Sequence, residues 1–195
     1  VLGEFAACLR RSPALVFAIL GSVLTHVILG ASYFDQKWLI AARGFSVTEA
    51  PMLVGLLFLV GGSLGTVAGG ALGDYFHARI KGGRLAFLAV ALVLLLPLGL
   101  LCRFVEARSA VFYFSIFVNC FTLTFFYGPV FSAVQDLVPA RVRSTALAVL
   151  LLASNLIGLS GGAYAAGALA DRFVQSGMDD PITWAVLYPI FVGMG

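Results

Sequence analysis

Long apolar stretches separated by short polar clusters set the pattern of this chain. The apolar blocks cover residues 14–34, 50–72, 85–102, 110–134, 145–170 and 182–195. A helix needs about 20 mainly apolar residues to cross the hydrocarbon core of a bilayer, and most of the blocks are of that order. The pattern therefore predicts an all-α membrane protein with six transmembrane helices in a single domain, residues 1–195. The last block is short for a span and Val1 is not an initiator methionine, so we expect a part of a longer protein.

Composition strengthens the membrane prediction. Hydrophobic residues make up 61% of the chain and charged residues 11%, and the mean hydropathy is +1.04. Water-soluble domains carry about 25% charged and 45–50% apolar residues, so this apolar excess is too large for a soluble core. The net charge of +3 is spread over the loops and gives no nucleic-acid footprint. Cys8, Cys102 and Cys120 show no metal-ligand spacing, and no metal or cofactor is expected.

The basic residues predict an orientation. If the N-terminus is cytoplasmic, that side carries Arg10, Arg11, Arg79, Lys81, Arg84, Arg141 and Arg143. The opposite side carries Lys37, Arg43, Arg103, Arg108 and Arg172. Because cytoplasmic loops are enriched in Lys and Arg, this bias predicts a multi-pass protein of the cell membrane with both ends of the sequence in the cytoplasm.

An internal repeat is visible in the second and fifth blocks. Residues 70–76 read GALGDYF and residues 167–173 read GALADRF, so both follow the pattern GALxDxF. Each copy closes the middle helix of a three-helix unit, and an odd number of spans separates the two copies. The copies therefore end on opposite faces of the membrane, which predicts a 3+3 inverted repeat of the kind found in one half of a transporter.

Small residues form a row on each of the two repeated helices. The first row consists of Gly61, Gly65, Gly69 and Gly73, and the second of Gly158, Gly162, Ala166 and Ala170. Small residues at every fourth position let two helix backbones approach closely in lipid. Two interpretations stay open: static packing inside this bundle, or a smooth surface that meets and slides on another domain.

Three further stretches resemble motifs of the major facilitator superfamily. The stretch from Gly70 through Asp74 to Arg84 resembles its G-x-x-x-D-x-x-x-x-[RK] loop, in the weaker version between the eighth and ninth helices. Residues 136–146 are similar to the loop that joins the tenth and eleventh helices, and residues 38–50 to the W…R-G-x-S…E-A exit of the seventh. The resemblance implies the C-terminal half of a transporter, whose N-terminal six-helix half is a missing partner.

Within the superfamily, the chain resembles the spinster-like branch. The resemblance rests on Tyr127-Gly-Pro129, on residues 135–139 (QDLVP) and on residues 155–158 (NLIG). The resemblance implies alternating-access transport of a small amphipathic or organic-anion substrate, a lysolipid or sphingolipid, with coupling to protons. Residues 33–38 (YFDQKW) depart from the pattern, because many relatives are wholly apolar there.

The candidate residues for conformational change combine charged residues of the matched loops with glycines of the first small-residue row. This conformational set is Asp74, Arg84, Asp136, Arg143, Gly61, Gly65 and Gly69. In the superfamily, the residue at Asp74 faces the start of a helix in the other half, where a carboxylate complements the helix dipole. The alternative is a local pair of Asp74 with Arg79 or Arg84.

A second acidic residue of this set, Asp136, is expected to act locally. It precedes Pro139 in the loop, with Arg141 and Arg143 close behind it. We expect an ion pair with one of these arginines to order the loop.

The first and fourth helices of such a half line the substrate cavity. The candidate substrate-binding residues are Ser22, His26, Tyr33, Asp35, Lys37, Asn119, Thr122, Thr124 and Tyr127. Aromatic walls with a few hydrogen-bonding groups suit an amphipathic ligand. His26 is the only histidine within a span, so it is either a proton-coupling group or a hydrogen-bond partner of a neighbouring helix. Asp35 and Lys37 are candidates for headgroup contacts.

Two other classes compete with a transporter. Residues 61–65 (GGSLG) match the G-x-S-x-G pattern of serine hydrolases, with Ser63 as nucleophile of an intramembrane protease. A serine nucleophile needs a general base, and no histidine follows Ser63 on a later span. A channel-forming bundle is the other class, although no filter loop or ring of charges is visible. The sequence therefore predicts a protein that is not an enzyme.

Overall fold

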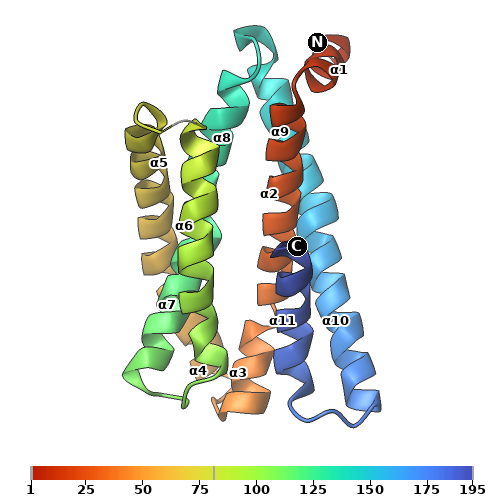
Figure 1. The fold of residues 1–195 in the computed structure, drawn as a ribbon. Coiled ribbons are helices and arrows are strands. Elements are labelled where there is room, and N and C mark those ends of the chain that lie inside the picture. The colour runs from red at the N-terminus through yellow and green to blue at the C-terminus, as the bar shows by residue number, and fades with distance from the viewer. Residues whose placement is uncertain (1, 81, 195) are drawn as a thin grey trace. The chain divides into compact units, whose positions relative to one another are not determined.

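The computed structural model describes the backbone of residues 2–80 and 82–194 and the side chains of residues 2–80 and 82–188. In these residues, helices joined by short turns make up the fold (Figure 1). The α-helices are α1 (Leu2–Arg11), α2 (Pro13–Ser32), α3 (Asp35–Arg43), α4 (Glu49–Leu57), α5 (Ser63–His77), α6 (Gly83–Leu100), α7 (Ala110–Phe125), α8 (Tyr127–Asp136), α9 (Arg143–Ala153), α10 (Ser160–Gln175) and α11 (Pro181–Met194). The short segments are the π-helices η1 (Phe58–Gly62) and η4 (Ser154–Leu159) and the 3-10 helices η2 (Leu101–Arg103) and η3 (Ala140–Val142).

Five continuous helical stretches among the described residues are long and apolar enough to cross a membrane. They are Pro13–Arg43, Glu49–His77, Gly83–Arg103, Ala110–Asp136 and Ala140–Gln175. Each matches a predicted span and runs beyond it, because helical hydrogen bonding continues into the polar ends. The predicted sixth span is the helix α11, whose 14 residues extend about 21 Å and stay below the length of a full span. The segment after the first span, expected as a loop, is largely the helix α3.

Contacts divide the chain into two compact units. Unit 1 combines residues 1–50 with residues 137–195, and unit 2 consists of residues 51–136. Unit 1 thus holds the first, fifth and sixth predicted helices, and unit 2 the second, third and fourth. The units differ from the two sequence repeats, because each takes helices from both. The prediction of a single domain over residues 1–195 stays a prediction.

Close packing of the first small-residue row explains why the second and fourth predicted helices belong to the same unit. A β-carbon on Gly61, Gly65 or Gly69 would lie within 3.0 Å of a backbone carbonyl oxygen of α7. The oxygens belong to Phe117, Phe121 and Phe125. Only glycine allows this approach, so the row packs the second predicted helix against the fourth. The interpretation as packing inside the bundle accounts for these contacts.

Unit 1 repeats the same arrangement. A β-carbon on Gly158 would clash with the carbonyl of Val23, and one on Gly162 with the carbonyl of Val27, both in α2. Alignment of the two GALxDxF segments places Gly61 opposite Gly158 in sequence and Gly65 opposite Gly162. The fifth predicted helix therefore packs on the first in the same way as the second packs on the fourth. The two repeat-related helices thus use equivalent glycines for equivalent contacts.

Both repeated helices also contain a π-helical segment that includes the first glycine of their row, Gly61 in η1 and Gly158 in η4. In unit 2, Thr124 Oγ1 donates a hydrogen bond of 2.7 Å to the carbonyl of Gly62, the last residue of η1. At the equivalent position in unit 1, Gly30 lies against the carbonyl of Leu159, the last residue of η4. π-Segments of this kind are rare and concentrate at functional sites.

The junction between the first two spans is built by a helix stop followed by a helix start. Gly44 adopts φ 70° at the end of α3, and the amide of Phe45 returns to the carbonyl of Leu39 at 3.1 Å. The Ser46 amide then donates to Glu49 Oε2 at 2.9 Å, and the Glu49 amide donates to Ser46 Oγ at 3.1 Å. This reciprocal capping box explains physically why the R-G-x-S…E-A pattern occurs at this turn.

Adjacent glycines give a matched test of the packing. Gly69→Ala should lower the free energy of unfolding by about 1–3 kcal/mol, because the new β-carbon overlaps the Phe125 carbonyl. Gly70→Ala should be neutral or stabilising by up to about 1 kcal/mol, since its β-carbon would meet nothing within 4 Å. Thermal unfolding of the detergent-solubilised full-length protein measures both. Equal stabilities of the two variants would contradict the close approach of α5 and α7.

Candidate functional site

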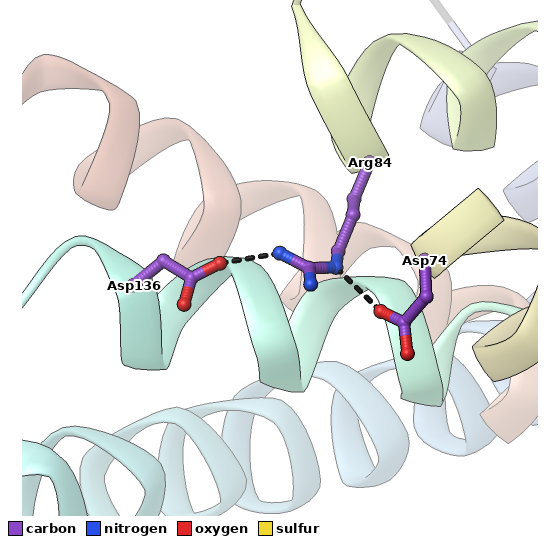
Figure 2. A network of polar contacts seen from close by, with 3 residues as sticks. All are labelled: Asp74, Arg84 and Asp136. Atoms are coloured by element: carbon purple, nitrogen blue, oxygen red, sulfur yellow. Dashed lines mark hydrogen bonds and ion pairs between the residues drawn. The ribbon is translucent and has the colours of Figure 1, made fainter. Parts of the chain in front are cut away.

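The clearest polar cluster of the described residues joins three helices at one end of unit 2 (Figure 2). Arg84 Nε lies 2.9 Å from Asp74 Oδ1, and Arg84 Nη1 contacts Asp136 Oδ2. Asp74 belongs to α5, Arg84 to α6 and Asp136 to the end of α8. The arginine side chain is only 15% exposed, whereas the carboxylates are 65% and 52% exposed. A mostly covered guanidinium thus bridges two carboxylates that face outward.

The turn between α5 and α6 places Arg84 in this cluster. Gly82 and Gly83 both adopt positive φ values, 96° and 60°, which reverse the chain in a conformation that favours glycine. Beside the turn, the rings of Phe76 and Phe87 stack at a centroid distance of 4.8 Å and fix α5 against α6. The first turn of α6 therefore brings Arg84 back beside Asp74.

Arg79, the other local partner considered for Asp74, contacts Tyr75 instead. Arg79 Nη1 donates a hydrogen bond of 2.8 Å to the carbonyl of Tyr75. Its guanidinium also lies 3.7 Å from the centre of the Tyr75 ring, a cation–π contact. Arg84 is consequently the partner of Asp74.

Asp136 contacts an arginine other than the two expected from the sequence. Asp136 pairs with Arg84 inside unit 2, whereas Arg141 Nη2 lies 2.8 Å from Glu4 Oε1 and ties η3 to α1 inside unit 1. Arg143 is the first residue of α9. The conformational roles of these residues stay predictions.

The repeat copy of Asp74 provides an internal comparison. Alignment of the GALxDxF segments makes Asp171 the equivalent of Asp74, and it lies near the end of α10. The position equivalent to Arg84 is Pro181, which begins α11 and carries no charge. Among the described residues, no ion pair involves Asp171. The bridged cluster therefore occurs in one repeat copy only.

Two candidate substrate residues of the first span belong to the packing of unit 1. Ser22 Oγ lies 2.9 Å from Ser154 Oγ, the first residue of η4. His26 is fully buried, with Nδ1 at 2.9 Å from the Ser22 carbonyl and its β-carbon beside Gly158. These contacts correspond to the interpretation of His26 as a partner of a neighbouring helix. A substrate role for both side chains and a proton-coupling role for His26 stay predictions.

The other candidates near the first span lie at its end. Tyr33 follows α2 and is exposed, and Asp35 and Lys37 occupy the first turn of α3. The Lys37 ammonium lies 6.0 Å from the Phe34 ring centre, at the outer limit of a cation–π contact. This end of the span carries an exposed tyrosine and an exposed lysine beside a carboxylate. These groups are of the kind that the predicted headgroup contacts require.

The candidates of the fourth span are distributed over different surroundings. Thr122 is buried and donates to the carbonyl of Val118, and Thr124 donates to the carbonyl of Gly62. Asn119 lies beside Gly99 of α6, since a β-carbon on Gly99 would come within 3.2 Å of Asn119. Tyr127 is half-buried and begins α8. Thr124 is thus used in helix pairing, and ligand contacts of all these residues stay predictions.

The glycines of the conformational set also lie inside unit 2. Gly61, Gly65 and Gly69 are buried against α7, as described above. The surface that they form is therefore covered within unit 2, which corresponds to the interpretation of the row as static packing inside the bundle. A role in conformational change stays a prediction and would act at the α5–α7 contact.

The serine of the protease alternative lacks a base on its own helix. Ser63 begins α5 and His77 ends it, and a helix of 15 residues separates the two by about 20 Å. Ser63 is exposed on the side of α5 away from the glycine row. In the described part of the chain, no group of three His, Cys, Asp or Glu side chains is arranged to hold a metal ion.

Sequence reasoning missed two features that shape the site. The π-segments have no distinctive composition that would identify them in the sequence. The structure shows that both end at the same distance before a GALxDxF segment. The Asp136–Arg84 contact joins residues far apart in sequence, and only the packing of α6 and α8 brings them together.

Comparisons with known proteins agree with this fold. No family model matches the chain. An MFS-type efflux pump of Mycolicibacterium smegmatis is 29% identical over 171 residues, which cover 86% of this chain and 39% of that protein. The crystal structure of a bacterial homologue of the human lysosomal transporter Spinster, inward-facing and unoccupied, matches 100% of this chain with a TM-score of 0.78 and 19% identity. The match covers 46% of that chain, so this sequence spans less than half of either protein.

These matches confirm the predicted fold. The chain is a multi-pass, all-α membrane protein whose fold is that of a little under half of the bacterial Spinster homologue. Both matched proteins are described as transport proteins and not as enzymes.

The bridged cluster yields a stability prediction. Arg84→Gln should destabilise the full-length protein by about 0.5–2 kcal/mol, because it removes up to two partly exposed ion pairs and leaves the two carboxylates without their shared cation. Arg79→Gln, which removes a neighbouring charge outside the cluster, is the matched control and should cost less. Thermal unfolding at low and high salt measures both, and the Arg84 effect should shrink at high salt. An Arg84→Gln protein as stable as wild type at both salt concentrations would contradict the bridge.

Proposed function

We propose that this chain is the C-terminal half of a secondary active transporter that works by alternating access. Its substrate is a small amphipathic molecule or organic anion, most specifically a lysolipid or sphingolipid, and transport is coupled to protons. Its partners are the lipid bilayer, the substrate and an N-terminal six-helix half of the same protein. The cell membrane is its location, with both ends of this sequence in the cytoplasm.

One observation carries the proposal: the entire chain superposes on a little under half of a transporter of known structure. Transporters of this construction bind substrate between their repeats and rock one part against the other. A six-helix half presents one wall of such a site. The second wall would come from the other half, which makes the isolated chain incomplete for transport.

The bridged cluster supports a conformational role. Arg84 holds Asp74 in place from one side, while the exposed part of that carboxylate keeps acceptor capacity. A negatively charged group of this kind stabilises the start of a helix, where backbone amides are unpaired. We propose that Asp74 contacts a helix start of the other half when the cytoplasmic side is closed.

The substrate class follows from resemblance and from the chemistry of the first span. The resemblance of residues 127–129, 135–139 and 155–158 to spinster-like motifs supports a lysolipid or sphingolipid as the substrate. Exposed Tyr33 and Lys37, with Asp35 between them, offer hydrogen-bonding and charged groups to a headgroup. The efflux pump among the relatives supports a broader class of amphipathic molecules, moved out of the cell.

Uptake into proteoliposomes tests the proposal. The full-length protein should move fluorescent lysophosphatidylcholine, and an imposed pH gradient should change the rate severalfold, since coupled protons add their driving force. The chain of residues 1–195 reconstituted alone should give the background rate. Robust coupled uptake by residues 1–195 alone would contradict the half-transporter.

Competition separates the substrate classes in the same assay. An excess of sphingosine should reduce lysophosphatidylcholine uptake, whereas a hydrophilic organic anion such as benzoate should not. Strong inhibition by benzoate without inhibition by sphingosine would reject the lipid substrate and retain the transporter.

A further inference from the structure

The fifth span, η4 with its flanking helices α9 and α10, has two faces of different character. One face carries the second small-residue row and packs against α2. The other face carries Asn155, Ser160 and Tyr164, which we call the polar stripe, and all three are exposed. Tyr164 is 79% exposed. A β-carbon on the neighbouring Gly161 would meet nothing within 4 Å, so this face is open.

The π-segment creates the polar stripe. In η4 the amide of Ser160 bonds to the carbonyl of Asn155, five residues earlier, and Ser160 Oγ also donates to that carbonyl at 3.2 Å. In a regular α-helix, positions five residues apart point in clearly different directions. The wider turn brings Asn155 and Ser160 onto one face, and Tyr164 continues it one α-helical turn later.

The stripe lies deep in the membrane-spanning part. The helical stretch Ala140–Gln175 has 36 residues, and Asn155 and Ser160 lie on either side of its midpoint, each within about 4 Å along the axis. Polar groups at this depth are costly against hydrocarbon and characteristically face a cavity or another part of the protein.

Two of the three side chains retain unused hydrogen-bonding capacity. The Asn155 amide nitrogen donates to the carbonyl of Leu151 at 2.8 Å, and Ser160 is satisfied by its own helix. Among residues 2–80 and 82–188, neither Asn155 Oδ1 nor the Tyr164 hydroxyl has a hydrogen-bond partner. An acceptor near the centre of the span and a hydroxyl about 10 Å from its midpoint are therefore presented outward.

The repeat copy shows that the architecture does not require a polar face. The residues equivalent to Asn155, Ser160 and Tyr164 are Phe58, Ser63 and Val67, which are exposed beside η1. The serine that follows each π-segment is common to both copies, while the amide and the phenol occur only in the fifth span. Packing and π-geometry are thus satisfied without them.

We infer that the polar stripe lines a water-filled substrate pathway and that Asn155 and Tyr164 hydrogen-bond the polar part of the substrate. The inference deepens the proposed function, on which it rests. An amide oxygen accepts from hydroxyl or ammonium groups, and a phenol donates to phosphate or carbonyl oxygens, so together they fit the polar end of an amphipathic molecule. The surrounding apolar span accommodates its tail.

Cysteine labelling in the full-length protein tests the water-filled pathway. In a background without native cysteines, Ser160→Cys and Tyr164→Cys should react with a membrane-impermeant methanethiosulfonate at least about tenfold faster than Val93→Cys, because only a hydrated thiol ionises. Val93 is 66% exposed in the part of α6 that is apolar throughout, residues 85–100, and is the lipid-facing control. Saturating lysophosphatidylcholine should slow labelling of both stripe positions. Labelling as slow as that of Val93→Cys, or labelling that the lysolipid leaves unchanged, would overturn the inference.

Transport kinetics test the hydrogen bonds. Tyr164→Phe and Asn155→Leu should each raise the KM for lysophosphatidylcholine by roughly two- to tenfold, the loss of one hydrogen bond, with the maximal rate little changed. Val93→Ala should leave both parameters unchanged. Unaltered KM values in both stripe variants would overturn the substrate contact. Absence of uptake by the wild-type protein would count against the proposed function instead, because labelling rates do not depend on turnover.

Discussion

The structure depends on the close approach of glycine rows to backbone carbonyls in two helix pairs. Lipid gives apolar helices no hydrophobic reason to associate, so contact between backbones must supply the attraction. Gly65 and Gly69 lie directly against carbonyls of α7, and Gly158 and Gly162 against carbonyls of α2. These pairs set which helices form each unit. They also position the π-segments and Thr124, whose hydroxyl reaches the Gly62 carbonyl only because the backbones are so close.

The sequence allowed the spans, the repeat and the small-residue rows to be predicted, because each depends on local periodicity or on a short motif. It did not identify the partners of the rows: a glycine at every fourth position shows that a helix packs closely, and says nothing of which neighbour it packs against. The helix α3 was missed because its charged first turn resembles a loop. Arg84 could not be separated from Arg79 by spacing, since the decision lies in the positive-φ turn at Gly82 and Gly83.

The candidate functional features fall in different places for physical reasons. The Arg84 cluster lies at a helix end, where charges are hydrated and their pairing can be exchanged at little cost. The polar stripe lies at mid-span, where a hydrogen-bonding group is expensive and is retained for a partner. The glycine-packed helix pairs hold the helices of each unit together. In the proposed transporter, the first feature would select the conformational state and the second would contact the substrate.

The distance between the two halves of the full-length protein tests this account most directly. A spin label at Ala78, in the exposed turn after α5, and one on the cytoplasmic end of the other half would report it. We expect two distance populations in the wild type. Asp74→Asn should enrich the longer one by roughly two- to thirtyfold, since a carboxylate at a helix start contributes about 0.3–2 kcal/mol, whereas its repeat counterpart Asp171→Asn should leave the ratio unchanged. A single distance shared by all three proteins would contradict alternating access by this half.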